Sequence, residues 1–391
     1  MIFPSRMHYD GLEMETFPVR TMRALALLGL ALALTGMCRL DGADQRAKQI
    51  DKLLKGLVAE REPGAAVLVA KDGRAIYNSS RGVADIQAMR PIDFRTSFRL
   101  ASVTKQFTAA AVMLLVRDGK LRYEDRLTDL FPDFPAYGRA ITIRNLLDHT
   151  SGLPDYEELM PAYDRTVPVE DVQIQDAGVL DLLKRQKAGW FGPGSRWYYS
   201  NSGYVLLGLI VEKASGRPFP DFLRERIFAP LNMIDTVAYV RGKNQVPNRA
   251  FGYGKENGRW SVTDQSPTSA TLGDGGVYSS LADLLQWDEA LSRHSLMSEA
   301  EMRPALMPVR VPSRGPIGPD GAPADYGFGW FLNGWKGHAR MWHHGETVGF
   351  RTAIQRFTDE GLTIIILCNR ADLDAAALSL KVAAIYLEGK R

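Results

Sequence analysis

The sequence predicts a mixed α/β fold of the α+β type, with one antiparallel sheet flanked by helices and a large, mainly helical insertion. Strand-like patterns gather near the two ends of the chain, before residue 100 and after residue 326, whereas 101–300 has mainly helical patterns. The composition of the 391 residues, 45% hydrophobic and 24% charged, is that of a globular protein with a large core. The net charge of +3 is too small to indicate a nucleic-acid-binding protein.

The N-terminal segment, residues 1–39, predicts a secretory signal. Arg23 precedes an apolar run over 24–34, which is followed by small residues. This run is shorter than the roughly 20 residues that a membrane-spanning helix needs. We therefore expect an exported protein, periplasmic or extracellular, without a membrane span. A lipid anchor at Cys38 is an alternative, although Met37 stands where a lipoprotein signal has a small residue.

The remaining residues, 45–391, predict one domain whose sheet part is split between 45–100 and 326–391. The mainly helical part covers 101–300, and the Pro/Gly-rich segment 302–325 is expected to be a loop. The expected elements of the sheet part are a helix at 43–60, a hairpin of 65–70 and 75–78, strands at 326–332, 340–343, 352–357 and 362–368, and a closing helix at 373–387.

Ser102 and Lys105 are the strongest catalytic candidates. Positions three apart share a helix face, so the Lys105 amine can reach the Ser102 hydroxyl. A hydroxyl becomes an effective nucleophile when a neighbouring base takes its proton, and a buried lysine can be that base. No other serine in the chain has a lysine at this spacing, so the pair indicates a covalent serine hydrolase. The alternative is a helix N-cap serine followed by a solvated lysine.

Tyr199 and Asn201 form the only Tyr-x-Asn sequence in the chain. A phenol near cations can relay protons, and an amide side chain both donates and accepts, which suits a substrate amide. The alternative is a loop tyrosine and an N-cap asparagine before a helix over 204–214.

A third element, His343-His344-Gly345-Glu346, follows the strand-like segment 339–342. A glycine there lets a substrate backbone lie against the strand edge. The alternative is that both histidines are partly buried strand residues. The glycine cluster at 273–276 is interpreted as a tight turn before a helix over 281–292, rather than as an anion cradle.

Together, the three elements resemble the motifs of the penicillin-recognising serine hydrolases, which are Ser-x-x-Lys, Tyr-x-Asn and Lys-Thr-Gly or His-x-Gly. The resemblance covers about 45–391 and implies a β-lactamase/transpeptidase-like fold, with the active site where the chain leaves the sheet for the insertion. Further segments that resemble this family are 148–154, 191–201, 203–216 and 273–280.

The resemblance implies a catalytic role for three residues. Ser102 would be the acylated nucleophile and Lys105 its base partner, while Tyr199 would relay the proton to the leaving group and later activate water. Which of Lys105 and Tyr199 is the acylation base stays open, because the two would titrate as a coupled pair.

The resemblance also implies binding roles. Asn201, His343 and Gly345 would hold the substrate, and the backbone N–H groups of Ser102 and Glu346 would form the oxyanion hole. His343 stands where efficient β-lactamases of this type have lysine. Because a histidine is mostly neutral at mildly alkaline pH, a substrate carboxylate should bind less well, which favours peptidase or esterase activity. The His-x-Gly form also resembles that of D-alanyl-D-alanine carboxypeptidases, which do bind a carboxylate.

We therefore expect an exported serine hydrolase that cleaves D-amino-acid peptides or small esters, and β-lactams less well, through an acyl-enzyme on Ser102. The alternatives are a class C-like β-lactamase and a penicillin-binding or sensor protein that is acylated without turnover. No metal or other cofactor is expected, since the six histidines lack zinc-site spacing and no nucleotide-binding loop occurs. His149 is interpreted as a structural loop residue. The natural substrate and the oligomeric state stay open.

Overall fold

The computed structural model of the chain describes residues 44–164, 166–313, 315–319 and 321–388. The chain separates into two compact units, 1–50 and 51–391. Helix covers the described part of the first unit, 44–50, and also 51–57 of the second, in agreement with the helix expected at 43–60. The predicted signal segment, with Cys38, lies outside the described residues.

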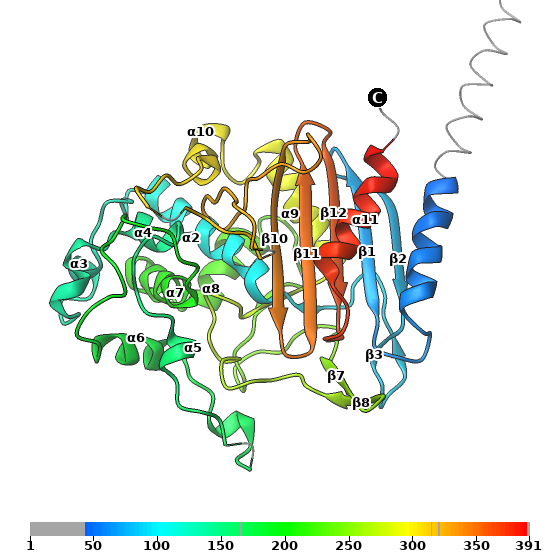
Figure 1. Cartoon of the computed structure of the whole chain (residues 1–391), viewed down its shortest axis with the longest axis horizontal. Helices are drawn as coiled ribbons and strands as arrows, with labels where there is room; N and C mark the ends of the chain where they lie inside the picture. The colour runs from blue at the N-terminus through cyan, green and yellow to red at the C-terminus, as the bar shows by residue number, and fades with distance from the viewer. Residues whose placement is uncertain (1–43, 165, 314, 320, 389–391) are drawn as a thin grey trace, which may run out of the picture. The chain divides into compact units, whose positions relative to one another are not determined.

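The second unit contains a five-stranded antiparallel sheet in the order β10-β11-β12-β1-β2 (Figure 1). The first hairpin turns at Asp72 and Gly73, as the sequence predicts, and β12 pairs back onto β1 along its whole length. The two ends of the chain therefore meet in one sheet, which confirms the fold class. The strands are β1 (Ala65–Lys71), β2 (Arg74–Arg81), β10 (Arg340–Thr347), β11 (Phe350–Phe357) and β12 (Leu362–Cys368).

Between β2 and β10 lies the insertion, which holds most of the helices. They are η1 (Ala101–Thr104), α2 (Lys105–Arg117), α3 (Leu127–Leu130), η2 (Ala136–Ala140), α4 (Ile143–Leu147), α5 (Tyr156–Leu159), η3 (Val169–Asp171), α6 (Asp176–Lys184), α7 (Asn201–Ser215), α8 (Phe219–Leu223), η4 (Arg224–Phe228), α9 (Leu281–Arg293), α10 (Glu299–Met302) and η5 (Arg303–Leu306). The C-terminal helix is α11 (Ala375–Leu387).

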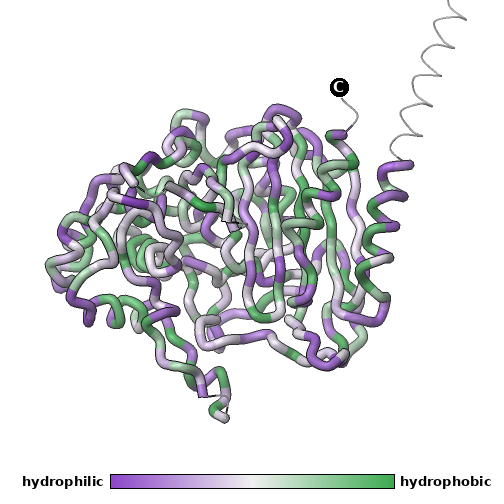
Figure 2. Tube along the Cα trace, viewed as in Figure 1, coloured by the Kyte–Doolittle hydropathy of each residue, from purple (hydrophilic) through white to green (hydrophobic). Residues whose placement is uncertain are grey.

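Helices cover both faces of the sheet. Arg356 of β11 forms an ion pair with Asp288 of α9 at 2.6 Å, whereas its neighbour Gln355 donates to Ser379 of α11 at 3.1 Å. Consecutive strand residues point to opposite faces, so α9 and α11 lie on opposite sides of the sheet, as Figure 1 shows. The central strands β1 and β12 are almost wholly buried, and Figure 2 shows hydrophilic residues at the turns between strands.

One prediction about secondary structure is wrong. The segment 326–332 is a turn and not a strand: the Gly327 N–H donates to the Trp330 carbonyl at 2.8 Å, and Gly329 has a φ of +75°. Because both glycines tolerate this tight geometry, the chain folds back on itself and the sheet resumes only at β10.

The sequence analysis did not predict the short strands before and within the insertion, which form small two- or three-stranded sheets. These strands are β3 (Val83–Asp85), β4 (Arg90–Pro91), β5 (Phe98–Arg99), β6 (Val237–Ala238), β7 (Tyr253–Glu256), β8 (Arg259–Val262) and β9 (Val277–Ser279). Segments of two to four residues are too short to show a clear alternating pattern in the sequence.

Candidate active site

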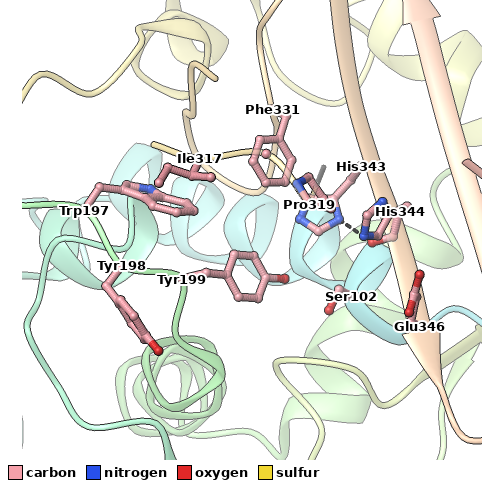
Figure 3. A pocket seen from close by; sticks show the side chains of 11 residues that line it. Ser102, Trp197, Tyr198, Tyr199, Ile317, Pro319, Phe331, His343, His344 and Glu346 are labelled. Atoms are coloured by element: carbon pink, nitrogen blue, oxygen red, sulfur yellow. Dashed lines mark hydrogen bonds between the residues drawn. The ribbon is translucent and has the colours of Figure 1, made fainter. Parts of the chain in front are cut away.

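Ser102 lies at the junction between sheet and helix. Strand β5 ends at Arg99, η1 begins at Ala101, and α2 begins at Lys105. Ala101 has a φ of +48°, a left-handed conformation that costs a non-glycine residue about 1 kcal/mol. This sharp turn places Ser102 at the start of the helical segment, where backbone N–H groups lack intrahelical partners. The Ser102 side chain lines a pocket of about 430 Å³ (Figure 3).

Lys105 is fully buried beside Ser102 and is held by three acceptors. Its Nζ donates to Ser102 Oγ at 3.1 Å, to Asn201 Oδ1 at 2.9 Å and to the Asp274 carbonyl at 3.0 Å. An ammonium group has three N–H donors, so this set satisfies all of them. The structure therefore brings Ser102, Lys105 and Asn201 together and rules out a solvated lysine.

Asn201 is the first residue of α7 and not its cap, which corrects the alternative interpretation. Its backbone N–H donates to Asp155 Oδ2 at 2.7 Å, and its Nδ2 donates to Glu157 Oε1 at 3.3 Å. Burial raises the pKa of Glu157 to about 7, and the neighbouring Asp155 adds to this rise. Sequence reasoning missed both carboxyl groups. They directly follow 148–154, a segment already linked to the site by resemblance, and that position was the available signal.

Tyr199 completes the group on this side of the pocket. Its ring lies 4.9 Å from Lys105 Nζ, and Figure 3 shows its hydroxyl directed toward Ser102. The ring also packs on His149, with centroids 4.3 Å apart. His149 is buried, and its Nδ1 accepts the Ser200 backbone N–H at 3.2 Å while Nε2 contacts Tyr326 Oη at 3.1 Å. His149 thus supports Tyr199 and does not face Ser102, in agreement with a structural role.

Gly345 on the edge strand β10 is required by close packing. A Cβ at this position would lie 2.1 Å from the Leu100 carbonyl oxygen and 2.6 Å from Thr352 Oγ1. The missing side chain therefore lets the turn that carries Ser102 approach β10. This differs from the expectation that the glycine makes room for substrate backbone.

Glu346 follows Gly345 on β10, and the hydrogen bonds of Trp342 on the same strand indicate the direction of the Glu346 backbone N–H. Trp342 exchanges both backbone hydrogen bonds with Phe331 at 2.9 Å, on the edge of β10 that faces away from β11. Backbone groups alternate in direction along a strand, so the Glu346 N–H, four residues on, points to that same free edge. Ser102 and Glu346 both line the pocket there, which suits a pair of oxyanion donors.

His343 is buried and faces the pocket in a neutral form. Its Nδ1 donates to the His344 carbonyl at 2.6 Å, and its Nε2 has no hydrogen-bond partner among the described residues. Burial, together with the charge of Lys105, lowers the pKa of His343 well below 6.5, and burial also lowers that of His344. Both histidines therefore stay neutral over a wider pH range than the sequence alone predicts.

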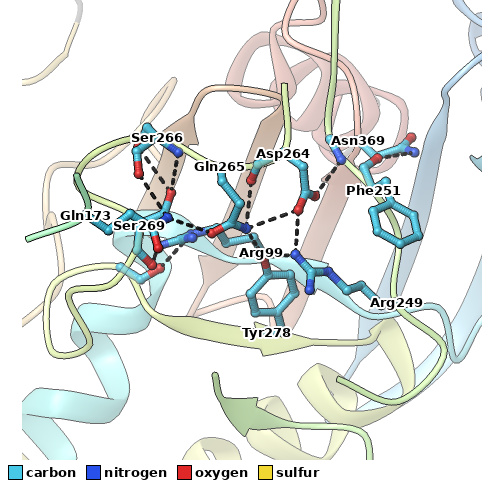
Figure 4. Close-up of polar contacts among 12 residues, drawn as sticks. Arg99, Gln173, Arg249, Phe251, Asp264, Gln265, Ser266, Ser269, Tyr278 and Asn369 are labelled. Carbon is cyan, nitrogen blue, oxygen red and sulfur yellow. Dashed lines mark hydrogen bonds and ion pairs between the residues drawn. The ribbon is translucent and has the colours of Figure 1, made fainter. Parts of the chain in front are cut away.

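The carbonyl of Asp274, which holds Lys105, lies in a turn that the buried Arg99 supports. Arg99 donates to the carbonyls of Gly275 and Ser269 at 3.2 and 3.0 Å, and these contacts fix the turn to β5 (Figure 4). The glycine cluster at 273–276 is thus a turn, as interpreted, but it leads into β9 before the helix begins, and it also borders the site. Ser280 then caps α9 by accepting the Asp283 N–H at 3.2 Å.

Among residues 44–164, 166–313, 315–319 and 321–388, no group of three or more His, Cys, Asp or Glu side chains could hold a metal ion. Within these same ranges, no helix is long and apolar enough to cross a membrane.

The comparisons with known proteins agree with this geometry. The penicillin-binding protein 4* of Bacillus subtilis (strain 168) is 34% identical over 358 residues, which cover 88% of this chain and 77% of that protein. A D-aminopeptidase of Cereibacter sphaeroides is 29% identical over 359 residues, and this chain spans 64% of its length.

Among solved structures, a D-amino acid amidase from Ochrobactrum anthropi SV3, complexed with L-phenylalanine amide, matches with a TM-score of 0.70 and 27% identity over 89% of this chain and 98% of that one. The Beta-lactamase family model matches residues 50–386. The chain therefore belongs to the Beta-lactamase family and is a serine hydrolase of that fold.

Proposed function

We propose that the protein is an exported hydrolase that cleaves amide or ester bonds of small substrates through an acyl-enzyme on Ser102. The observation that carries the proposal is the contact of the buried Lys105 Nζ with Ser102 Oγ at 3.1 Å, at the base of an open pocket. A serine in such contact with a lysine is an activated nucleophile.

In the acylation step, Ser102 Oγ attacks the substrate carbonyl carbon and passes its proton either to Tyr199 in its phenolate form or to Lys105 in its neutral amine form. The negative oxygen that forms accepts hydrogen bonds from the backbone N–H groups of Ser102 and Glu346. When this intermediate collapses, the bond to the leaving group breaks, and the leaving nitrogen or oxygen takes up the proton. Donors of this kind typically contribute about 10²–10³ in rate.

In the deacylation step, water attacks the ester on Ser102 after giving a proton to a base. Tyr199 directs its hydroxyl toward Ser102 (Figure 3), and His343 presents an unpartnered Nε2 that can accept a proton or hydrogen bond. The carboxylic acid then leaves, and Ser102 regains its proton. Tyr199 is the base that this arrangement supports best.

The expected substrates are D-amino-acid amides and peptides or small esters. Two relatives are described as a D-aminopeptidase and a D-amino acid amidase. The pocket has a set of apolar lining residues, which suits an aliphatic or aromatic substrate side chain. Its apolar members are Trp197, Ile317, Pro319 and Phe331.

A non-turnover penicillin-binding protein is the second candidate, because the relative with 34% identity is described as penicillin-binding. The proposal that the protein is exported comes from the N-terminal sequence. Its test is cell fractionation of a tagged full chain, where retention in the cytoplasm would refute it.

The activity is tested with D-phenylalanine amide, p-nitrophenyl butyrate and a fluorescent penicillin, each with the parent protein and Ser102→Ala. Turnover that is lost in Ser102→Ala supports the proposal, and intact-protein mass spectrometry should show the acyl group on Ser102. A stable penicillin label without turnover of either other substrate would favour the second candidate. Full activity in Ser102→Ala would refute both.

A further inference from the structure

On its strand side, the pocket has one acidic group, and the described lining residues include no lysine or arginine. Glu346 lines the pocket on β10, and its side chain is 63% exposed (Figure 3). The two histidines beside it, His343 and His344, are kept neutral by burial. On the opposite side, Glu157 and Asp155 surround Asn201. A substrate at Ser102 therefore lies between carboxyl groups.

The described arginines nearest to the pocket do not line it. Arg351 Nε lies 3.9 Å from Glu346 Oε2, and its Nη1 donates to the carbonyls of Thr347 and Phe350, so Arg351 pairs with Glu346 from outside the pocket and leaves that carboxylate on the pocket surface. Arg196 stacks on the rings of Phe191 and Tyr198, at 4.6 and 5.9 Å, and does not line the pocket.

Among the described residues, Lys105 is the cation that contacts Ser102, and it lies in the floor of the pocket. Its three N–H donors are already engaged by Ser102, Asn201 and Asp274, so none is free for a substrate carboxylate. A carboxylate in the pocket would lose water and gain no ion pair, while it would face Glu346 at short range.

We propose that Glu346 acts as a charge filter, which excludes substrates with a carboxylate near the scissile bond and admits neutral or cationic ones. This inference rests on the proposed function, since it concerns ligands that bind at Ser102. It gives the Glu346 side chain a role in specificity that is separate from the role of its backbone N–H.

The test uses three boronic acids that differ mainly in charge, namely phenylboronic, 3-carboxyphenylboronic and 3-(aminomethyl)phenylboronic acid. Each forms a bond from Ser102 Oγ to boron, which becomes tetrahedral as the serine proton passes to the buffer. Calorimetry on the full chain at pH 7.5 gives the three dissociation constants. We expect the anionic probe to bind about tenfold more weakly than the neutral one, and the cationic probe at least as tightly.

Two variants assign the effect to Glu346. In Glu346→Gln the ratio between anionic and neutral probes should shrink about fivefold, and in Glu346→Lys it should invert. The matched control is Glu256→Gln, which removes a carboxylate from β7 outside the pocket and should leave the ratio unchanged. The difference in the parent should also shrink in 1 M salt, because screening shortens electrostatic range to about 3 Å.

Equal affinity for the three probes in the parent, or an unchanged ratio in Glu346→Gln, would refute the charge filter while leaving the proposed function intact. The proposal would also be refuted if the ratio of the anionic and neutral dissociation constants changed in Arg196→Gln and not in Glu346→Gln. That result would assign charge selection to Arg196. If no probe binds the parent, or if binding persists in Ser102→Ala, the proposed function itself fails.

Discussion

The floor and the strand wall of the pocket are built in opposite ways. In the floor, Lys105 uses every N–H donor of its ammonium group on Ser102, Asn201 and Asp274. In the wall, His343 leaves Nε2 without a partner among the described residues, and Glu346 forms a long ion pair with Arg351 at 3.9 Å.

This difference indicates which part of the pocket makes and breaks bonds and which part discriminates among ligands. A fully satisfied group is fixed in position, so the floor presents the nucleophile in one geometry before substrate arrives. An unsatisfied buried group costs free energy, and it is retained where a substrate or water can supply the missing partner. We infer that the floor performs the bond-making steps and that the wall discriminates among ligands.

The largest expected effect comes from breaking the floor with Lys105→Met. The change removes the base partner of Ser102, so kcat/KM for p-nitrophenyl butyrate should fall by about 10³–10⁴. It also leaves Asn201 Oδ1 and the Asp274 carbonyl without their donor, which should lower the free energy of unfolding by about 1–3 kcal/mol.

Steady-state kinetics and urea unfolding of the parent and the variant measure these two effects. The control is Lys120→Met at an exposed position just after α2, which should keep parental activity. If Lys105→Met retained more than a tenth of the activity, Lys105 would not be part of the bond-making machinery.

The second prediction concerns the contact between the floor and the wall, which Gly345→Ala should disrupt. The added methyl group would lie 2.1 Å from the Leu100 carbonyl, so the turn that carries Ser102 must shift. Overpacking of this kind costs about 1–3 kcal/mol, and a displacement near 1 Å at the nucleophile should lower kcat about 10²-fold.

Gly192→Ala is the matched control, because a Cβ at Gly192 meets nothing within 4 Å. It should leave both the melting temperature and kcat within experimental error of the parent. Parental kcat in Gly345→Ala would show that β10 and the Ser102 turn move independently.

The same contrast explains how far the sequence could predict the site. Ser102 and Lys105 are close in the chain, so helical spacing alone predicts their contact. Asn201 and Asp274 reach Lys105 from segments about 100 and 170 residues away, and only the resemblance to a known family indicated them. The tight packing at Gly345 depends on the backbone of Leu100, which no local pattern encodes.

The fold was predictable in outline for a related reason. Strands of seven or eight residues with apolar runs, such as β12, show a clear pattern, whereas β6 and β9 are too short to do so. The segment 326–332 has the composition of a strand, but Gly327 and Gly329 allow the turn that the structure shows.

The third prediction tests whether His343, in the strand wall, is neutral in the folded protein. Burial lowers the pKa of His343 well below 6.5, so the unfolded chain binds a proton below pH 6.5 that the folded chain does not. The free energy of unfolding should therefore fall with decreasing pH in this range. Relative to His343→Gln, the parent should lose up to about 1.4 kcal/mol per pH unit below pH 6.5.

Urea unfolding at pH 7.5, 6.0 and 5.0 measures this difference directly. Comparing the parent with a single variant cancels the opposite trend of Glu157, whose raised pKa favours the folded state at lower pH. His294→Asn, at an exposed position, is the control and should run parallel to the parent. Identical pH slopes in the parent and His343→Gln would mean that His343 is protonated in the folded protein.

The smallest expected effect concerns the turn that joins the floor to the sheet. Ala101 has a φ of +48°, so Ala101→Gly relieves about 1 kcal/mol of backbone strain but adds a similar entropy to the unfolded chain. The free energy of unfolding should change by less than about 1 kcal/mol. Because glycine lets Ser102 occupy a wider range of positions, kcat should fall about threefold with little change in KM.

Ala101→Val provides the opposite case, since a β-branched side chain at this φ is strained and should lower the melting temperature. A rise in kcat for Ala101→Gly would show that the strained turn restrains the nucleophile against reaction, and the floor could then no longer be described as preorganised.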